Sequence, residues 1–136
     1  GDDTSGSLWS RTRAYGVNTL AFRLCQNDAF YKIDADCVGI IPGKIDWSLN
    51  RQWLDILSVS GSPLFISVKP DDITDSMKED IKKAFFRNSG QKDKAEPLDW
   101  LYNNQPQCWL INGEKREYDF VENSYPELLS GSTQSY

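Results

Sequence analysis

The stretch "WLDILSVSGSPLFISV" (Trp53–Val68) joins two structural elements of different kinds. Its first half continues a helical stripe of apolar residues, for which Ser48 is a suitable N-cap and Gly61 a suitable end. Its second half, Pro63–Val68, is a continuous apolar run, which predicts a short strand that is covered on both faces. A helix followed directly by such a strand is typical of α/β proteins.

The segments around this stretch repeat the alternation. A strand rich in β-branched and aromatic residues is predicted over Phe30–Ile41, where Pro42-Gly43 stops it. After the central stretch, Thr74 can cap a helix that runs to about Arg87. Leu8–Cys25 reads as a further helix, because apolar residues recur there at helical spacing; they are Ala14, Val17, Leu20, Ala21, Leu24 and Cys25. The order predicts parallel β/α units.

The C-terminal third has a different pattern. Residues 91–97 are polar and glycine-flanked, which predicts a linker between a unit at 1–90 and a second unit at 98–136. Asn112-Gly113 lies between two strand-like runs within Gln107–Val121, which is the strongest short-range signal for a β-hairpin. We therefore expect an antiparallel hairpin separate from the parallel sheet.

Composition and charge narrow the class of protein. The chain has 136 residues, no apolar run that could span a bilayer, and a net charge of −5. This charge argues against nucleic acid as a partner, because phosphates require a concentrated basic face. No secretory leader opens the sequence, so we expect a targeting signal to be absent or removed. The compartment stays open, and neither nucleic acid nor a membrane is an expected partner.

The missing residue types narrow the chemistry. The sequence has no histidine, which removes Ser-His and Cys-His catalysis and the usual zinc sites. Cys25, Cys37 and Cys108 are widely spaced and odd in number, so free buried thiols are expected rather than a disulfide framework or a metal site. No glycine-rich phosphate motif occurs. Carboxylates remain as the plausible catalytic groups, and no cofactor or metal is expected.

Several stretches in order resemble the closing β/α units of clan D glycoside hydrolases, the α-galactosidase (melibiase) type. They are "YKIDADCVGI" (Tyr31–Ile40), "WLDILSVSGSPLFIS", "DDITDSMKEDIKKAF" and "PLDWLYNNQPQCWLINGEKREYDF". The resemblance implies the last β/α units of a (β/α)8 TIM barrel, followed by the start of a C-terminal β-domain. It also implies a retaining hydrolase that cleaves terminal α-linked sugars with two aspartates.

The resemblance assigns roles to three residues of the substrate rim. Asp34 and Asp36 interrupt an apolar strand, where a carboxylate is costly unless it is paired or solvated. At the carboxyl end of a barrel strand, where active sites lie, this cost disappears. The two aspartates would then bind substrate or simply order the rim loop. Trp47, which follows the same strand, could stack on a sugar.

The first residues carry the catalytic assignment. "GDDTSGSLW" (Gly1–Trp9) resembles the family's stretch after strand six, where an aspartate precedes a tryptophan and the next helix. That aspartate is the general acid/base, and Asp3 is the best match, with Asp2 as the fallback. The other interpretation of these residues is a solvated end or a helix cap. The family's nucleophile lies on strand four, which this sequence does not contain.

One departure from the family concerns the strand-eight loop, where Ser67 is followed by Val68-Lys69-Pro70 instead of Asn-Asp or Asp-Asp. Lys69 would pair with a rim carboxylate or be an exposed loop lysine. The expected partners are an α-galactoside-like carbohydrate and the N-terminal remainder of the chain's own barrel, and self-association stays open. The isolated chain would be inactive. The alternative is a non-catalytic α/β module that binds carbohydrate or protein.

The barrel interpretation also makes packing expectations. Tyr31, Ile33, Leu64 and Ile66 would line the inner face of the barrel. Trp53 would belong to the core, whereas Trp100 and Trp109 would attach the β-domain to the barrel.

Overall fold

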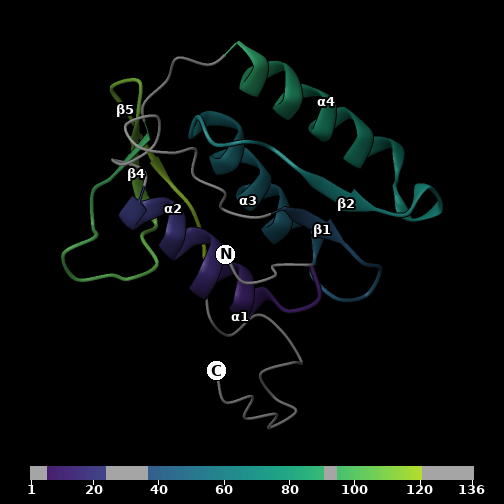
Figure 1. Ribbon diagram of the computed structural model, residues 1–136, viewed down its shortest axis with the longest axis horizontal. Coiled ribbons are helices and arrows are strands. Elements are labelled where there is room, and N and C mark those ends of the chain that lie inside the picture. Colours follow the sequence, from purple (N-terminus) through teal and green to yellow (C-terminus); the bar gives the residue numbers. More distant parts are fainter. Residues whose placement is uncertain (1–5, 24–36, 91–94, 121–136) are drawn as a thin grey trace, which may run out of the picture.

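The computed structural model describes residues 6–23, 37–90 and 95–120, which form a mixed α/β structure (Figure 1). Three helical segments accompany a two-stranded parallel sheet and a three-stranded antiparallel sheet, and the described residues show no barrel. The helical segments are α1 (Trp9–Arg11) with η1 (Thr12–Val17) and α2 (Asn18–Arg23), then α3 (Trp47–Val59) and α4 (Asp75–Ser89). The strands are β1 (Val38–Ile40), β2 (Ile66–Val68), β3 (Ala95–Pro97), β4 (Cys108–Ile111) and β5 (Glu114–Glu117), and a short turn, η3 (Pro70–Asp72), follows β2.

The predicted parallel pair is confirmed. β1 pairs with β2 in parallel, with Val38 opposite Ile66, and α3 connects the two strands. The described part of the first strand is shorter than the predicted Phe30–Ile41, and residues 30–36 lie outside the described residues. Two parallel strands need a long crossover connection, usually a helix. The alternation of strand and helix patterns in the sequence therefore predicts the parallel topology.

β2 is not covered on both faces, contrary to the expectation from its apolar sequence. Leu64 is buried in the core and Ile66 packs against it, so the assignment of these two side chains to an inner barrel face is wrong. Side chains alternate along a strand, and Phe65, which lies between them, is 53% exposed. Ser67, two residues on, is exposed as well, so this face has no cover among the described residues. Of these residues, only β1 pairs with β2, which leaves the other edge of β2 unpaired.

The two long helices have side-chain caps at their N-termini. Thr74 caps α4 as predicted, because its hydroxyl oxygen accepts a hydrogen bond from the Met77 N–H at 3.2 Å. The cap of α3 is Asp46 rather than Ser48: the Asp46 carboxylate accepts a hydrogen bond from the Ser48 N–H at 2.8 Å. This hydrogen bond holds the pKa of Asp46 below its usual value. The predicted cap, Ser48, lies two residues after the observed one, because the side chains of Asp and Ser are both able to accept a hydrogen bond from a free N–H group at a helix start.

The first helix buries the predicted stripe at Val17, Leu20 and Ala21 but not at Ala14. Thr12–Val17 adopt π-helical geometry, which rotates the following residues relative to an α-helix. Ala14 is therefore exposed, and Arg13 is buried, where its guanidinium donates a hydrogen bond to the Phe120 carbonyl at 3.2 Å. Leu24 and Cys25, the last predicted residues of the stripe, lie outside the described residues.

The predicted hairpin is confirmed. β4 and β5 are antiparallel, and the turn between them places Asn112 at φ 53° and Gly113 at φ 82°. Two successive residues with positive φ are the mark of a type I′ turn. β3 adds an edge strand to β4, so Ala95–Pro97, the described end of the predicted linker, belong to this sheet. Pro97 is compatible with an edge position because an edge strand can leave one N–H side unpaired.

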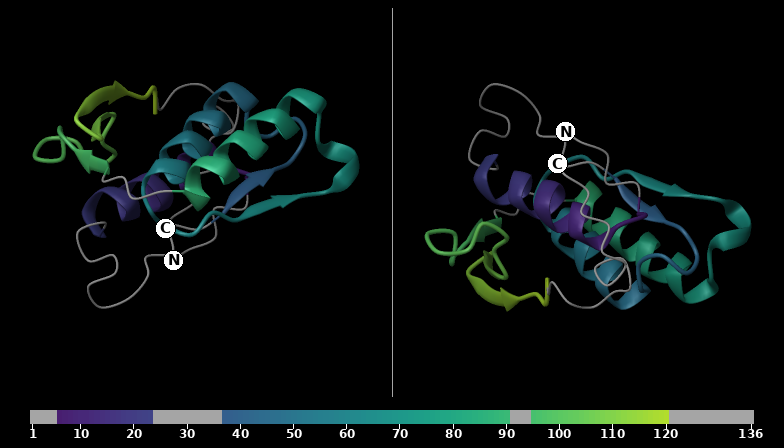
Figure 2. Two further views of the ribbon diagram at one scale, coloured as in Figure 1. Left: turned by 90° about the horizontal axis from the view of Figure 1, so that it is seen from above. Right: turned by 90° about the horizontal axis from the view of Figure 1, so that it is seen from below.

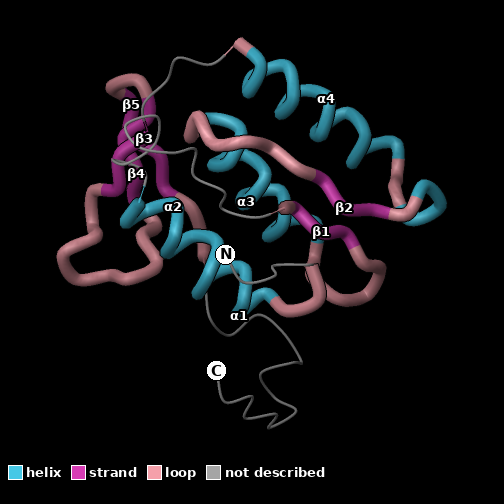
Figure 3. The backbone as a smooth tube through the Cα atoms, in the orientation of Figure 1, coloured by secondary structure: helices cyan, strands magenta, loops and turns pink. Residues whose placement is uncertain are grey.

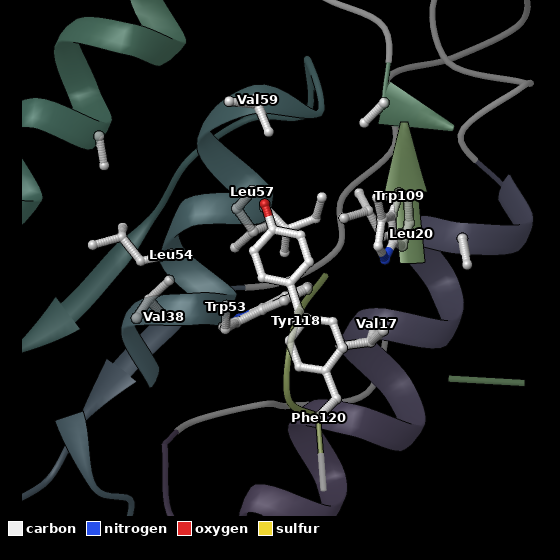
Figure 4. Packing of buried hydrophobic residues seen from close by; sticks show 14 of the residues in the cluster. Val17, Leu20, Val38, Trp53, Leu54, Leu57, Val59, Trp109, Tyr118 and Phe120 are labelled. Carbon is white, nitrogen blue, oxygen red and sulfur yellow. The ribbon is translucent and has the colours of Figure 1, made fainter. Parts of the chain in front are cut away.

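The core lies between α3, the first helix and the antiparallel sheet (Figure 4). Trp53 is fully buried, as predicted, and Trp109 is buried in the same cluster. Tyr118 and Phe120 stack with their ring centroids 5.4 Å apart and lie between α3 and the first helix. Trp100 is half-exposed and meets Phe22 of α2 edge-on at 6.4 Å. The C-terminal sheet therefore attaches through aromatic contacts.

The two sheets lie at opposite ends of the molecule. Figures 2 and 3 place the loops after β1 and β2 at one end and the antiparallel sheet at the other, with α3 and α4 side by side between them. In the described part of the chain, no helix is long and apolar enough to cross a membrane.

Candidate functional site

A pocket of about 620 Å³ lies where the two parallel strands end. We call it the rim pocket. Its lining comes from the loop after β1, the starts of α3 and α4, the turn after β2 and the segment before α1; the residues are Ser7, Leu8, Ile40, Ile41, Pro42, Gly43, Lys44, Ile45, Asp46, Trp47, Asn50, Asp72, Thr74 and Met77. Ligands of α/β proteins bind at this edge of a parallel sheet.

The segment before α1 is held tightly against β1. Gly6 has φ +85°, and a Cβ atom built on it would lie 2.1 Å from the Gly39 carbonyl oxygen. The same carbonyl accepts a hydrogen bond from the buried Asn50 side-chain amide at 2.7 Å. Only glycine permits both this φ and this approach. The chain three residues after Asp3 is therefore fixed at the carboxyl half of β1.

Trp47 lies in the rim pocket, as expected for a residue that follows the first parallel strand. Its indole N–H donates a hydrogen bond to the Asp80 carboxylate of α4 at 3.0 Å, and the ring is partly buried against the core. Because this bond occupies the only polar atom of the side chain, the ring face is what Trp47 can offer to a ligand. A ring face can stack on the apolar face of a sugar.

The other predicted site residues lie outside the described residues. These are Asp2, Asp3, Asp34 and Asp36. Asp3 stands three positions before Gly6 in the sequence. Asp34 and Asp36 precede β1 in the sequence, whereas the lining of the rim pocket from this part of the chain begins with Ile40.

Sequence reasoning missed two acidic residues of the rim pocket, Asp46 and Asp72. Asp46 follows the Pro42-Gly43 stop, and Asp72 ends the turn after β2. The signal that could have identified them is their position: each is the last or next-to-last polar residue between a predicted strand and the following helix. Lys69 is exposed and does not line the rim pocket, and Asp34 and Asp36, the rim carboxylates it was expected to pair with, lie outside the described residues.

The charge of the rim pocket disfavours an anionic ligand and suits one that donates hydrogen bonds. Asp46 and Asp72 outweigh Lys44, and the low pKa of Asp46, caused by the Ser48 N–H, keeps this carboxylate ionised at neutral pH. A carboxylate offers about four acceptor positions, so a cap hydrogen bond leaves room for a hydroxyl group. The described residues contain no group of three or more acidic, cysteine or histidine side chains that could hold a metal ion.

The two described cysteines are half-buried free thiols rather than fully buried ones. Partial burial and the nearby carboxylates of Asp99 and Glu117 raise the pKa of Cys108. A raised pKa reduces the thiolate fraction at neutral pH, which is opposite to the shift that activates a nucleophilic cysteine.

Comparisons of the chain with protein families, with curated proteins and with solved structures found no match.

We expect Gly6→Ala to displace the segment that follows Asp3. The new methyl group would collide with the Gly39 carbonyl, and the backbone could not keep its positive φ without strain. If Asp3 is catalytic, a displacement on the order of ~1 Å lowers kcat/KM by about 10²-fold in the protein completed by its upstream residues. Amide hydrogen exchange near Gly6 and Gly39 should accelerate as well.

Gly113→Ala is the matched control for this substitution. Gly113 has nearly the same φ, +82°, but a methyl group there would meet nothing within 4 Å. It therefore imposes the backbone strain without the collision. Equal effects of the two substitutions on hydrogen exchange near Gly39 would contradict the tight fit of the segment.

Proposed function

We propose that this chain is the closing part of the (β/α)8 catalytic barrel of a retaining glycoside hydrolase of α-galactosidase type. The observation that carries the proposal is the rim pocket. It lies at the carboxyl ends of two parallel strands, and the segment that follows Asp3 forms one of its walls. In barrel enzymes the active site is built from the loops at this end of the strands.

The uncovered surfaces support a barrel that continues beyond these residues. β2 has a free edge among the described residues, and Phe65, which directly precedes β2, is exposed to solvent. Helix α4 buries only Ala84, and Phe86 on its surface is 84% exposed. A strand on the free edge and a helix beside α4 are what the next β/α unit of a closed barrel would supply.

The chemistry requires two carboxylates and no cofactor. Asp3 would protonate the leaving-group oxygen and then activate water, while a nucleophile from the preceding residues attacks the anomeric carbon. In retaining enzymes the two groups are about 5–5.5 Å apart, so the second carboxylate and partial burial raise the pKa of the acid. Asp2 is the fallback for this role.

Substrate binding would fall to the rim. Asp46 and Asp72 can accept hydrogen bonds from sugar hydroxyls, and Trp47 can stack on the ring. In this proposal Asp34 and Asp36 bind substrate or order the rim. The antiparallel sheet would be the start of the C-terminal β-domain, which makes the other expected partner the N-terminal remainder of the barrel.

The alternative is a non-catalytic module that binds carbohydrate or protein through exposed aromatic residues. The loop between β3 and β4 favours it, because Trp100, Leu101 and Tyr102 are all exposed there. The Asp99 carboxylate fixes this loop by accepting hydrogen bonds from the Asn103 side chain and from the Gln107 and Cys108 N–H groups. A fixed loop with exposed aromatic side chains is suited to recognition.

The experiment that separates the two is a hydrolysis assay on the chain joined to its upstream coding sequence. We expect hydrolysis of aryl α-galactosides and related α-glycosides, and none of the β-anomers. Binding of sugar without hydrolysis of any α-glycoside, abolished by Trp100→Ala and unaffected by Trp47→Ala, would establish the binding module instead.

A further inference from the structure

A second cavity, of about 590 Å³, lies between α3, α4 and β5, and it shares no lining residue with the rim pocket. We call it the basic pocket. Four cationic side chains line it: Arg51 from α3, Lys83 and Arg87 from α4, and Arg116 from β5. Three acidic side chains, Asp55, Asp80 and Glu117, also line it. The formal charges of the lining are therefore nearly balanced. Whether the cavity attracts an anion or a cation depends on which of these side chains already have hydrogen-bond partners.

The three acidic side chains are already engaged. Asp55 accepts hydrogen bonds from Arg87, from Arg116 at 2.9 Å and from the Tyr118 hydroxyl at 2.7 Å. Asp80 accepts from the Trp47 indole, and Glu117 pairs with Lys115 at 2.9 Å. Burial, together with the Asp55 charge, raises the pKa of Tyr118, so this hydroxyl remains a donor to Asp55.

The cationic side chains keep N–H donors that form no hydrogen bond to the acidic residues. Arg51 and Lys83 are exposed and have no hydrogen-bond or ion-pair partner among residues 6–23, 37–90 and 95–120. In the bonds to Asp55, Arg87 and Arg116 each use only the Nη1 group of a guanidinium that carries five N–H donors. With its acids satisfied, the cavity offers a net excess of positively charged donors.

From these contacts we propose that the basic pocket binds a tetrahedral oxyanion, a phosphate or sulfate group. Asp55 holds the guanidinium groups of Arg87 and Arg116 in place. The paired N–H donors of a fixed guanidinium match the spacing of two oxygens of phosphate or sulfate. Arg51 of α3 and Lys83 of α4 would donate further hydrogen bonds to the anion. The anion could be free or could be an ester on a small sugar, and the two sources share this chemistry.

The probe is inorganic phosphate, titrated by calorimetry into the chain, alone or joined to its upstream sequence. We expect saturable binding that weakens as the concentration of sodium chloride rises, since the donors at the mouth are exposed. The double substitution Arg51→Gln/Lys83→Gln should weaken binding about tenfold or more, because it removes two charge-assisted donors. Neither side chain has a hydrogen-bond or ion-pair partner among the described residues, so we expect the fold to be kept.

The control is Lys82→Gln, which removes one positive charge, as Lys83→Gln does by itself, from a neighbouring side chain that pairs with Glu79 outside the basic pocket. It should leave phosphate binding unchanged. A hexose phosphate that binds more tightly than inorganic phosphate, with the neutral hexose inert, would identify an ester as the source; equal affinities would identify the free anion. No saturable binding of phosphate or sulfate, or equal losses in the double variant and the control, would overturn the site.

Discussion

Replacing Asp3 with asparagine in the completed protein should slow the hydrolysis of α-galactosides with poor leaving groups by ~10²–10⁴-fold, the usual contribution of general acid–base catalysis. Asparagine keeps the size of the side chain but cannot deliver a proton. A poor leaving group, such as a second sugar, needs that proton, whereas an activated aryl group leaves without it. Glycosylation of the nucleophile should therefore remain fast on aryl substrates carrying strong electron-withdrawing groups.

The matched control is Asp2→Asn, which makes the same change one residue earlier. We expect it to leave both substrate classes nearly unaffected. If both substrate types lose activity equally in Asp3→Asn, Asp3 has a structural role. A normal Asp3→Asn together with an inactive Asp2→Asn would move the assignment by one residue.

The second large effect concerns the 136-residue chain on its own. Phe65 and Phe86 expose most of their rings at the places where a barrel would continue. At ~25 cal/mol per Å² of apolar surface, loss of the burial that a closed barrel provides removes several kcal/mol, comparable with the ~5–15 kcal/mol stability of a whole domain. We expect the isolated chain to self-associate or fold only in part, and to lack glycosidase activity.

Joining the upstream coding sequence should restore a monomeric, cooperatively melting protein. Phe86→Gln should have opposite effects on the two proteins. It should make the isolated chain more soluble, and it should lower the stability of the completed protein by roughly 3–5 kcal/mol, the usual cost of losing a buried aromatic ring. Light scattering and thermal unfolding measure both effects. An isolated chain that is monomeric, with a sharp melt and dispersed amide resonances, would show a complete domain and favour the binding module.

Local rules predicted much of the fold. The stripe that ends at Gly61 and the apolar run after it predicted α3, β2 and their parallel partner, because alternating elements leave few topologies. Asn112-Gly113 predicted the hairpin turn, since both positions require positive φ and these residue types tolerate it. Thr74 predicted the start of α4.

The misses have physical causes that a single sequence hides. The π-helical turn at Thr12–Val17 shifts the buried stripe from Ala14 to Arg13, and no spacing rule signals such a turn. The continuous apolar run at Pro63–Val68 resembles a strand covered on both faces, yet Phe65 has no cover within the described residues. For the candidate site, Trp47 was predicted from its place after a strand. Asp46 and Asp72 were missed because they line one pocket only through two loops that are distant in the sequence.

The most direct test of the proposed function is the anomeric configuration of the first product. Proton NMR can follow the completed protein as it hydrolyses an aryl α-galactoside, before the released sugar mutarotates. A double displacement by two carboxylates predicts that the α-anomer forms first. Initial release of the β-anomer would contradict the retaining mechanism, and a folded, completed protein that hydrolyses no α-glycoside would contradict the assignment to a glycoside hydrolase.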